Sequence, residues 1–312
     1  MTIEKESASS LFDSDGENRI QIAQGNDYEY STSKDIFTFY KYEVSGLLVL
    51  DPRPAQSALR IIYPADYEPY IFNEMGWFVR WAKKTVQTSK VKKICSSLEN
   101  GSNILDVGCG NGSLLRSIKS HHPESYNLYG NDLAKECLDK LSAIGITTHS
   151  ESIYDLLYEN HFDVVILNQV IEHFDDPARL LRKCYDILKP GGKIFIETPS
   201  SSGLDYTLFQ SSLWGGYHFP RHFYIFNDKN IRLLLKESEF SDFESEYLLS
   251  PAFWTQSLHH FFVSRGFERL AKFFHLKNPI LTMLVSFIDF VRIKCSLKTS
   301  NMRILAKKPN YE

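Results

Sequence analysis

Cysteine is scarce in this sequence, and the few cysteines are not arranged to pair. The 312 residues contain five of them, none within a C-x-x-C motif. This pattern excludes a disulfide framework and a zinc knuckle, and it is typical of a reducing compartment. A marked charge is also missing, because the formal net charge is only −3. Such a balance gives no reason to expect nucleic acid as a partner. The scattered cysteines are Cys95, Cys109, Cys137, Cys184 and Cys295.

Targeting and membrane-spanning segments are not evident either. The N-terminus is polar and acidic, without a secretory signal, so we expect a cytoplasmic protein. The apolar run at 279–291 is too short to cross a bilayer, which takes about 20 residues. Basic residues at 292, 294 and 298 follow it, so 279–298 could contact a membrane surface. We expect packing against the domain or a second subunit, as in a homodimer, ahead of membrane contact.

The most informative stretch is a turn with three alternate glycines. A short apolar run, Ile104–Val107, ends in Gly108, Gly110 and Gly112, and an apolar pattern at helical spacing follows from Ser113. This pattern predicts a strand, a tight turn and a helix. Glycines permit positive φ and let a ligand approach the main chain. The helix start offers free N–H groups, so a nucleotide-like ligand is expected at this turn.

Two aspartates indicate which ligand this is. Dinucleotide dehydrogenases prefer G-x-G-x-x-G, but here Ser113 stands where the third glycine belongs. Asp106 lies within the strand just before the turn and suits a cationic ligand better than a pyrophosphate. Asp132 follows the next expected strand, where a carboxylate accepts hydrogen bonds from ribose hydroxyls. These features favour S-adenosylmethionine (SAM) and disfavour the alternative of an NAD-dependent oxidoreductase.

Four segments resemble class I SAM-dependent methyltransferases. N-I-L-D-V-G-C-G-N-G-S-L-L (103–115) resembles their motif I, and N-Q-V-I-E-H-F-D-D-P (168–177) their segment after the fourth strand. L-K-P-G-G-K-I-F-I-E-T-P (188–199) resembles their approach to the fifth strand. P-R-H-F-Y-I-F (220–226) is similar to a subgroup associated with small-molecule and polysaccharide biosynthesis. The resemblance implies an α/β fold: a Rossmann-like, doubly wound, seven-stranded, mostly parallel sheet with an antiparallel edge hairpin.

The resemblance also implies a set of SAM-binding residues. Asn168 would line the methionine side, while Ser152 and Ile153 would flank the adenine. The full expected set is Asp106, Gly108, Cys109, Gly110, Asp132, Leu133, Ser152, Ile153 and Asn168.

The acceptor would face two histidine-bearing segments. His173 follows the fourth strand, at the edge where open α/β sheets bind ligands. In the loop 214–223, His218 or His222 could take the acceptor proton, and Arg221 could clamp a phosphate or carboxylate. Trp214 and Tyr217 in this loop could stack on a sugar or another ring. The alternatives are that His173 packs under the cofactor and that Arg221 is a structural latch paired with an acid.

We predict no metal at either of two places. Residues 168–177 resemble ubiquinone-pathway O-methyltransferases, in which a Glu, Glu, His cluster is associated with a metal. Glu172 and His173 match the last two positions, but Gln169 replaces the first acid. Relatives also carry a zinc ribbon before a P-R-P turn. Its cysteines would fall near Tyr42 and Ser45, and because neither residue is a cysteine, we predict no zinc there.

The chain divides into five expected parts. We predict a mobile segment at 1–33, a cap and leading helix at 34–98, and a SAM-binding core at 99–250. A helical insertion at 251–300 and a final strand with its tail at 301–312 follow. Tyr67 and Tyr70 are expected near the SAM pocket, and the lysines of the leading helix on a solvated face.

The predicted function is transfer of a methyl group from SAM to a small-molecule or glycan-precursor acceptor, at oxygen. The alternative from another class is a binding or scaffold protein that keeps the fold without catalysis.

Overall fold

A seven-stranded mixed sheet forms the centre of the computed structural model, which describes residues 2–8, 11, 18–64 and 77–310. For residues 77–83 only the backbone is described. The strand order is β12-β13-β10-β9-β6-β7-β8. The strands are β6 (Ser102–Val107), β7 (Tyr126–Asn131), β8 (Thr147–His149), β9 (Phe162–Asn168), β10 (Leu188–Pro199), β12 (Ser241–Leu248) and β13 (Asn301–Lys307).

Five neighbouring strands are parallel, so their carboxyl ends share one edge. β10, β9, β6, β7 and β8 pair in parallel, whereas β13 is antiparallel to both of its neighbours. β9 is a nearly continuous apolar run because both faces of this central strand are buried. The predicted Rossmann-like sheet and its antiparallel edge hairpin are confirmed.

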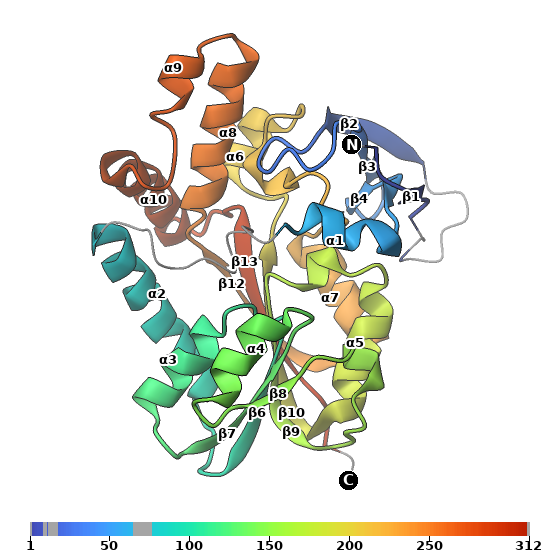
Figure 1. Cartoon of the computed structure of the whole chain (residues 1–312), viewed down its shortest axis with the longest axis vertical. Coiled ribbons are helices and arrows are strands. Elements are labelled where there is room, and N and C mark those ends of the chain that lie inside the picture. The colour runs from blue at the N-terminus through green and yellow to red at the C-terminus, as the bar shows by residue number, and fades with distance from the viewer. Residues whose placement is uncertain (1, 9–10, 12–17, 65–76, 311–312) are drawn as a thin grey trace.

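Helices cover both faces of this sheet (Figure 1). The side chains of the first group pack with Ile104 and Val164 in one apolar cluster, and those of the second pack with Leu105 and Val165 in another. The first group is α2 (Trp77–Cys95), α3 (Ser113–His121) and α4 (Lys135–Ser142); the second is α5 (Pro177–Ile187) and α7 (Asp228–Glu237). Local signals set the helix starts: Asp176 caps α5, whose first residue is Pro177, and a capping box at Asn227 begins α7.

A small antiparallel sheet caps the carboxyl edge. Its order is β11-β4-β3-β2, and it includes residues from the N-terminal third and from the P-R-H loop. The strands are β2 (Arg19–Gly25), β3 (Phe37–Tyr42), β4 (Leu48–Leu50) and β11 (Tyr224–Ile225); β1 (Lys5–Glu6) pairs with β5 (Arg53–Pro54), and η1 (Gln56–Ala58) and α1 (Leu59–Ile62) follow. Within the segment 1–33, which was expected to be mobile, residues 19–25 form β2, and β2 pairs with β3 on either side of a register shift between Gln21 and Ala23.

The helical insertion lies beside the cap, at the same end of the molecule (Figure 1). It consists of α8 (Pro251–Ser264), α9 (Glu268–Ala271) and α10 (Pro279–Lys294). Trp254, Leu281 and Val285 form its small core. The Asp289 carboxylate joins α10 to α8, because it accepts hydrogen bonds from Ser250 and from the Trp254 indole. Among the described residues, no helix is long and apolar enough to cross a membrane.

Candidate functional site

The glycine turn lies between β6 and α3, as predicted. Gly108, Gly110 and Gly112 all have positive φ, at 65°, 51° and 71°. A Cβ on Gly112 would lie 2.2 Å from the Leu141 side chain, so no larger residue fits there without repacking. Cys109 is half-buried within the turn. The turn is therefore held in a conformation that favours glycine and brings the main chain close to the sheet edge.

Asp132 joins this turn to the end of β7. Its carboxylate accepts hydrogen bonds from the Gly110 amide at 2.8 Å and the Ala134 amide at 2.8 Å. An ionised carboxylate has about four acceptor positions, so about two remain for other donors. Asp132 is half-buried, and Leu133 beside it is exposed. The arrangement fits a ligand that brings a pair of hydroxyl groups, such as a ribose.

Asp106 is a buried acid at the carboxyl end of β6. It is only 3% exposed, and it accepts no hydrogen bond from the described part of the chain. Burial raises its pKa to about 7, and only the charge of Lys90 opposes this shift. A buried carboxyl without a donor is costly unless a ligand supplies one. Asp106 therefore fits the ammonium group of SAM.

Lys90 is a residue that the sequence analysis missed. It was expected on a solvated helix face, but its Nζ donates to the Asn168 Oδ1 at 2.6 Å and forms an ion pair with Glu197. Asn168 and Glu197 face each other at the ends of β9 and β10. The sequence did contain a signal for this inward position. Lys90 is adjacent to Val91 and one helical turn from Ile94, and both of these apolar residues are buried in α2.

The expected adenine side lies past β8. Ile153 is buried in η3 (Ile153–Asp155), and the Ser152 hydroxyl accepts from the Tyr154 amide at 3.4 Å. The contacts of Ser152 and Ile153 in the structure are thus with the protein. Their predicted place beside an adenine stays a prediction.

The structure brings together the three histidines that were predicted to face the acceptor. His173 lies in η4 (Ile171–His173), and its ring centroid is 4.8 Å from that of His222 and 6.4 Å from that of His218. The rings of His218 and His222 are 4.9 Å apart. The His218 Nδ1 lies 2.7 Å from the Glu29 Oε1, a carboxylate from the cap that the sequence analysis missed. No local signal relates the two, because they are far apart in the chain.

Glu172 lies beside His173 and His222 and is completely buried. Its Oε2 accepts from the Thr198 hydroxyl at 3.0 Å, whereas its Oε1 has no hydrogen-bond partner. Burial raises the pKa of Glu172 to about 8. Burial also lowers the pKa of His173 to about 3 and holds the pKa of His222 well below its usual value. Near neutral pH, the two imidazoles are therefore uncharged.

The hydrogen bonds of the two imidazoles indicate which ring nitrogen is available. The Nδ1 of His173 lies 3.0 Å from the Arg221 carbonyl oxygen, and the Nδ1 of His222 lies 2.8 Å from the Gly216 carbonyl oxygen. A carbonyl can only accept, so we assign the proton of each neutral ring to Nδ1 and the lone pair to Nε2. The Tyr63 hydroxyl, 2.9 Å from the His173 Nδ1, is then a second acceptor for that proton. This is the usual arrangement of metal-binding histidines.

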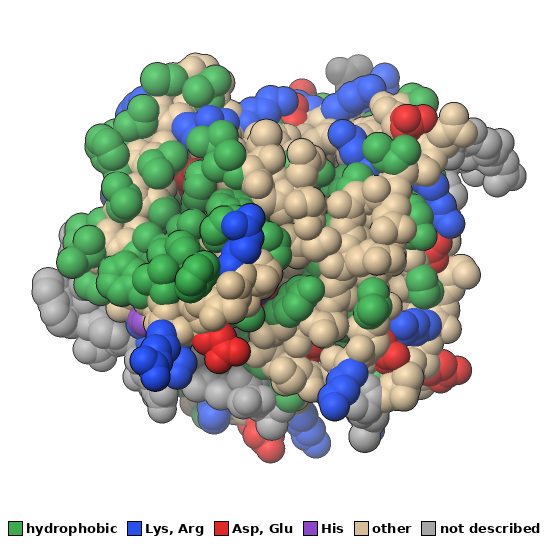
Figure 2. Space-filling model, turned by 90° about the horizontal axis from the view of Figure 1, so that it is seen from above, with side chains coloured by type: hydrophobic (Ala, Val, Ile, Leu, Met, Phe, Trp, Pro, Cys, Tyr) green, Lys and Arg blue, Asp and Glu red, His purple; other side chains and the backbone are tan. Residues whose placement is uncertain are grey.

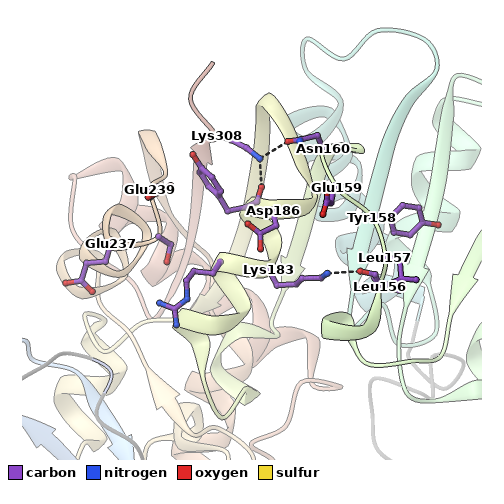
Figure 3. Close-up of a pocket in the computed structure, with 13 residues that line it drawn as sticks. Leu156, Leu157, Tyr158, Glu159, Asn160, Lys183, Asp186, Glu237, Glu239 and Lys308 are labelled. Carbon is purple, nitrogen blue, oxygen red and sulfur yellow. Dashed lines mark hydrogen bonds between the residues drawn. The ribbon is translucent and has the colours of Figure 1, made fainter. Parts of the chain in front are cut away.

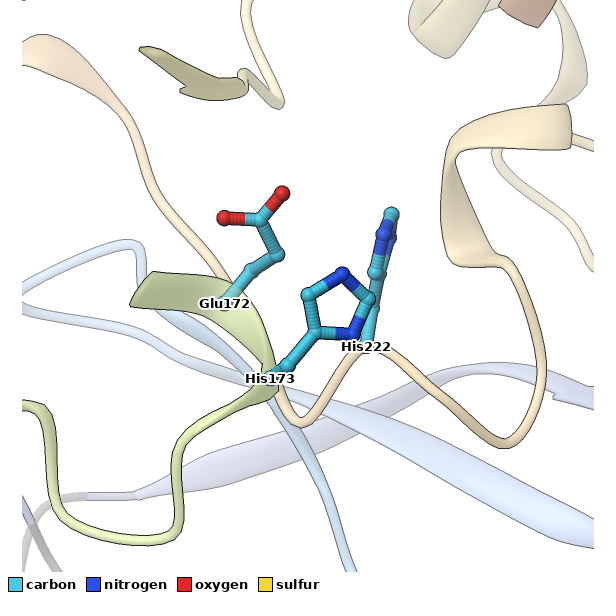
Figure 4. A group of neighbouring side chains, drawn as sticks. All are labelled: Glu172, His173 and His222. Atoms are coloured by element: carbon cyan, nitrogen blue, oxygen red, sulfur yellow. The ribbon is translucent and has the colours of Figure 1, made fainter. Parts of the chain in front are cut away.

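Glu172, His173 and His222 could together hold a metal ion (Figure 4). One ligand atom of each lies within 4.8 Å of the others. The unpartnered Glu172 oxygen and the two backbone-oriented imidazoles fit a divalent cation. The prediction of no metal relied on Gln169 replacing an acid, whereas His222 is a third candidate ligand that comes from another segment.

Arg221 points away from this cluster into a buried ion pair. Its guanidinium donates to both carboxylate oxygens of Asp27, at 3.0 and 2.9 Å, and to the Ile62 carbonyl oxygen at 2.7 Å. Both side chains are fully buried, and the guanidinium also lies 4.4 Å from the Tyr30 ring centroid. These contacts favour the latch that links the loop to the cap over a clamp for an acceptor anion.

The aromatic residues of the loop are also buried. Trp214 donates its indole N–H to Asp205 at 2.8 Å, and the Tyr217 hydroxyl donates to the Gln210 carbonyl oxygen. With exposures of 1% and 0%, neither ring offers a surface on which a sugar could stack. The predicted stacking role was wrong for this conformation. Tyr67 and Tyr70, expected near the SAM pocket, lie outside the described residues.

One surface hollow lies away from this site. It has a volume of about 840 Å³ and opens beside the amino ends of β9 and β10, the opposite edge of the sheet (Figure 3). Its Lys308 ammonium is already bonded to Asn160 and to the carbonyl oxygens of Tyr185 and Leu188. We therefore place the candidate site at the carboxyl edge, where open α/β sheets bind their ligands.

The chain is similar to known methyltransferases in sequence and in fold. A sequence model of a methyltransferase-domain family matches residues 78–245. A ubiquinone biosynthesis O-methyltransferase from Vibrio parahaemolyticus is 36% identical over 106 residues, or 31% of this chain and 44% of that protein. One of the same name from Coxiella burnetii is 30% identical over 105 residues, covering 31% and 44%. The chain thus spans less than half the length of these curated relatives.

A solved structure shows the same fold. Phosphoethanolamine N-methyltransferase 2 of Haemonchus contortus, in complex with SAM, superposes with a TM-score of 0.53 at 19% identity. The match covers 94% of this chain and 69% of that one. The family model covers more than half of the chain. The chain therefore belongs to the methyltransferase-domain family, among the class I SAM-dependent methyltransferases.

Proposed function

We propose that this chain transfers a methyl group from SAM to a hydroxyl oxygen of a small-molecule acceptor. The observation that carries the proposal is the cluster at the carboxyl edge of the sheet, in which buried Glu172 and His222 meet half-buried His173 and His218. The Vibrio and Coxiella relatives are named as O-methyltransferases, which supports oxygen as the methylated atom. The burial of Trp214 and Tyr217 favours an acceptor other than a sugar.

The cofactor would lie across the ends of β6, β7 and β9. When bound, SAM supplies an electrophilic methyl carbon on a sulfonium, which an acceptor oxygen attacks in line. Asp132 would accept the ribose hydroxyls, and Asp106 would accept the ammonium. The Lys90 ammonium donates to Asn168, and it would bind the methionine carboxylate. Asp106 and Lys90 are thus opposite in charge to the SAM groups that they would contact, and Asp132 would accept from neutral hydroxyls.

The proton of the acceptor needs a base. His173 is poorly suited to this role because a pKa of about 3 makes it a weak proton acceptor near neutral pH. We assign the role to His218. Glu29, bonded to its ring, would stabilise the positive charge that His218 gains. The acceptor hydroxyl would thus lose its proton to His218 as the methyl group arrives.

Glu172, His173 and His222 would instead position the acceptor oxygen. A divalent cation bound there would polarise that oxygen and lower its pKa. Metal ions compete with protons for the same lone pairs, so imidazoles that are already neutral are available as ligands. Tyr63 also contacts this cluster, because its hydroxyl lies 2.9 Å from the His173 Nδ1.

The test is an untargeted methylation assay. Cell-extract fractions are incubated with the chain and methyl-labelled SAM, and labelled products are identified by mass spectrometry and NMR. We expect an O-methylated small molecule with the wild type and a strongly reduced yield with His218→Ala. His121→Ala, which changes an exposed histidine on α3, is the matched control. SAM binding without transfer to any fraction would favour the scaffold alternative, and an N-methylated product would contradict the assignment to oxygen.

A further inference from the structure

The outer face of the helical insertion is apolar and uncovered. Eleven large apolar side chains between residues 263 and 297 are exposed, and Figure 2 shows apolar side chains gathered on this side of the molecule. On α10 the exposed stripe includes Ile280 at 73% and Phe287 at 64%. The exposed set is Val263, Phe267, Leu270, Phe273, Ile280, Met283, Leu284, Phe287, Phe290, Val291 and Leu297. We name it the apolar face.

The helix α10 is apolar on two sides, although only one of them is buried. Leu281 and Val285 face the protein, and their stripe is separated from the stripe of Ile280, Leu284 and Phe287 by about a quarter turn. A helix that is apolar all round is normally covered on all sides. Exposed apolar patches of this extent mark sites of contact with proteins or membranes.

The charge of the insertion indicates which occupant fits. Residues 263–298 contain seven Lys and Arg but only two acids, whereas the whole chain has a net charge of −3. One of the two acids, Asp289, is buried in the hydrogen bonds that hold α10 to α8. Figure 2 shows basic side chains at the border of the apolar face. The basic residues are Arg265, Arg269, Lys272, Lys277, Arg292, Lys294 and Lys298.

A second copy of the chain does not fit this distribution. In a two-fold dimer the same patch meets itself, so two basic rims would lie within about one Debye length of each other. An anionic lipid surface instead provides apolar contact for the centre and negative charge for the rim. The buried bonds of Asp289 keep the face on a fixed platform, so binding would not require the insertion to fold.

We propose that the apolar face docks the protein on the surface of an anionic membrane. The insertion also packs against the loop 214–223, which carries His218 and His222, because the Gly215 amide donates to the Ser257 hydroxyl of α8 at 2.9 Å. A docked molecule would thus hold the candidate acceptor site close to the lipid headgroups. The proposal does not depend on the reaction, because membrane binding can be measured without SAM or acceptor.

The experiment is sedimentation of the full chain with vesicles. Vesicles of phosphatidylcholine alone are compared with vesicles containing phosphatidylglycerol, at low and high salt. We expect wild-type protein to sediment with the anionic vesicles and to be released by salt. Lys294→Glu with Lys298→Glu should weaken binding by about tenfold or more, because each basic residue near the surface contributes separately.

Apolar variants separate docking from simple charge attraction. The double variant Ile280→Asp and Phe287→Asp should abolish sedimentation with the vesicles. The control is Leu157→Asp, which changes a side chain that is 99% exposed outside the apolar face and should not affect sedimentation. Circular dichroism confirms that each variant is folded. Equal binding to both vesicle types, or no sedimentation, would overturn the proposal. A dimer in analytical ultracentrifugation that the Ile280/Phe287 variant dissociates, without vesicle binding, would assign the face to a second copy instead.

Discussion

His173 and His222 come from opposite sides of β10 in the sequence, yet their ring centroids lie 4.8 Å apart. Backbone carbonyl oxygens hold both Nδ1 atoms, so both Nε2 lone pairs are available beside Glu172. The arrangement is more specific than a general acid–base site requires, and it brings together three titratable groups, of which Glu172 and His222 are buried and His173 is half-buried.

The first prediction concerns a metal. Titration of the metal-free chain with Co²⁺ should produce the visible absorption of a site with nitrogen and oxygen ligands. His222→Ala should weaken Co²⁺ binding by at least about tenfold, because the remaining pair is an incomplete site. His121→Ala should bind Co²⁺ as the wild type does. Absorption that is unchanged in His222→Ala would place the ion elsewhere.

The second prediction concerns the pH dependence of stability without metal. Burial raises the pKa of Glu172 from 4.5 to about 8, so between these values the folded chain retains a proton that the unfolded chain releases. The free energy of unfolding should therefore fall as the pH rises towards 8. In Glu172→Gln this fall should be smaller, and the measurement is thermal unfolding with a chelator at pH 6–8.5.

His173 has the opposite effect at lower pH. Its folded pKa of about 3 lies below the usual 6.5, so the free energy of unfolding should rise as the pH increases between these values.

The control for the Glu172→Gln variant is Glu237→Gln, which removes one exposed charge of the same kind. Parallel pH curves for the wild type and Glu172→Gln would show that the Glu172 carboxyl is not perturbed.

The third prediction concerns SAM affinity at Asp132. Asp132→Ala should weaken SAM binding in calorimetry by about 1–3 kcal/mol, the scale for a buried hydrogen-bonding group. Asp132→Asn should lose less, because one oxygen can still accept from the Gly110 amide. The exposed Asp139→Ala on α4 should bind SAM normally. An unchanged affinity in Asp132→Ala would remove this acid from the pocket.

The fourth prediction assigns a function to Lys90. Lys90→Ala should weaken SAM binding by about tenfold, the effect of one charge-assisted bond. Decarboxylated SAM should bind equally well to the variant and the wild type, because it lacks the group that Lys90 would contact. Lys92→Ala, exposed on the same helix, is the control. If Lys90→Ala weakens both ligands alike, the lysine only supports Asn168 and Glu197.

The fifth prediction separates a latch from an anion clamp at Arg221. Asp27→Asn should destabilise the chain by about 3–5 kcal/mol, the usual cost of breaking a buried ion pair. Arg221→Lys should also destabilise it, because an ammonium cannot bond both Asp27 oxygens and the Ile62 carbonyl in one plane. Protein that remains folded should keep its KM for the acceptor. A raised KM with unchanged thermal stability would indicate an anion clamp.

The parts of the fold that the sequence predicted depend on local patterns. The glycine turn, the apolar run of β9 and the proline at the start of α5 each specify a local structure within about ten residues. The order of β12, β13 and β10 followed from the family resemblance. β2 was missed because its surroundings are polar, although Ile20 and Ile22 alternate with glutamines as in a strand.

The candidate site was predictable only in part, for a related reason. His173, His218 and His222 could be selected because their segments follow adjacent strands. The partners that determine their chemistry could not. Asp27 and Glu29 come from the cap and meet the loop across most of the chain, so no spacing indicates that Arg221 is occupied or that His218 has a carboxylate beside it.

The hairpin at the sheet edge has a consequence for how this protein can change over evolution. Leu248 and Asn301 pair directly, so the chain leaves β12 and returns to β13 at neighbouring points. The segment between them is an insertion whose two ends lie next to each other, and a short turn could connect the same two strands. Helices can therefore be lengthened, exchanged or lost there without changing the register of the strands that carry the glycine turn. The same methyltransferase core could in this way acquire insertions that bind it to different cellular surfaces.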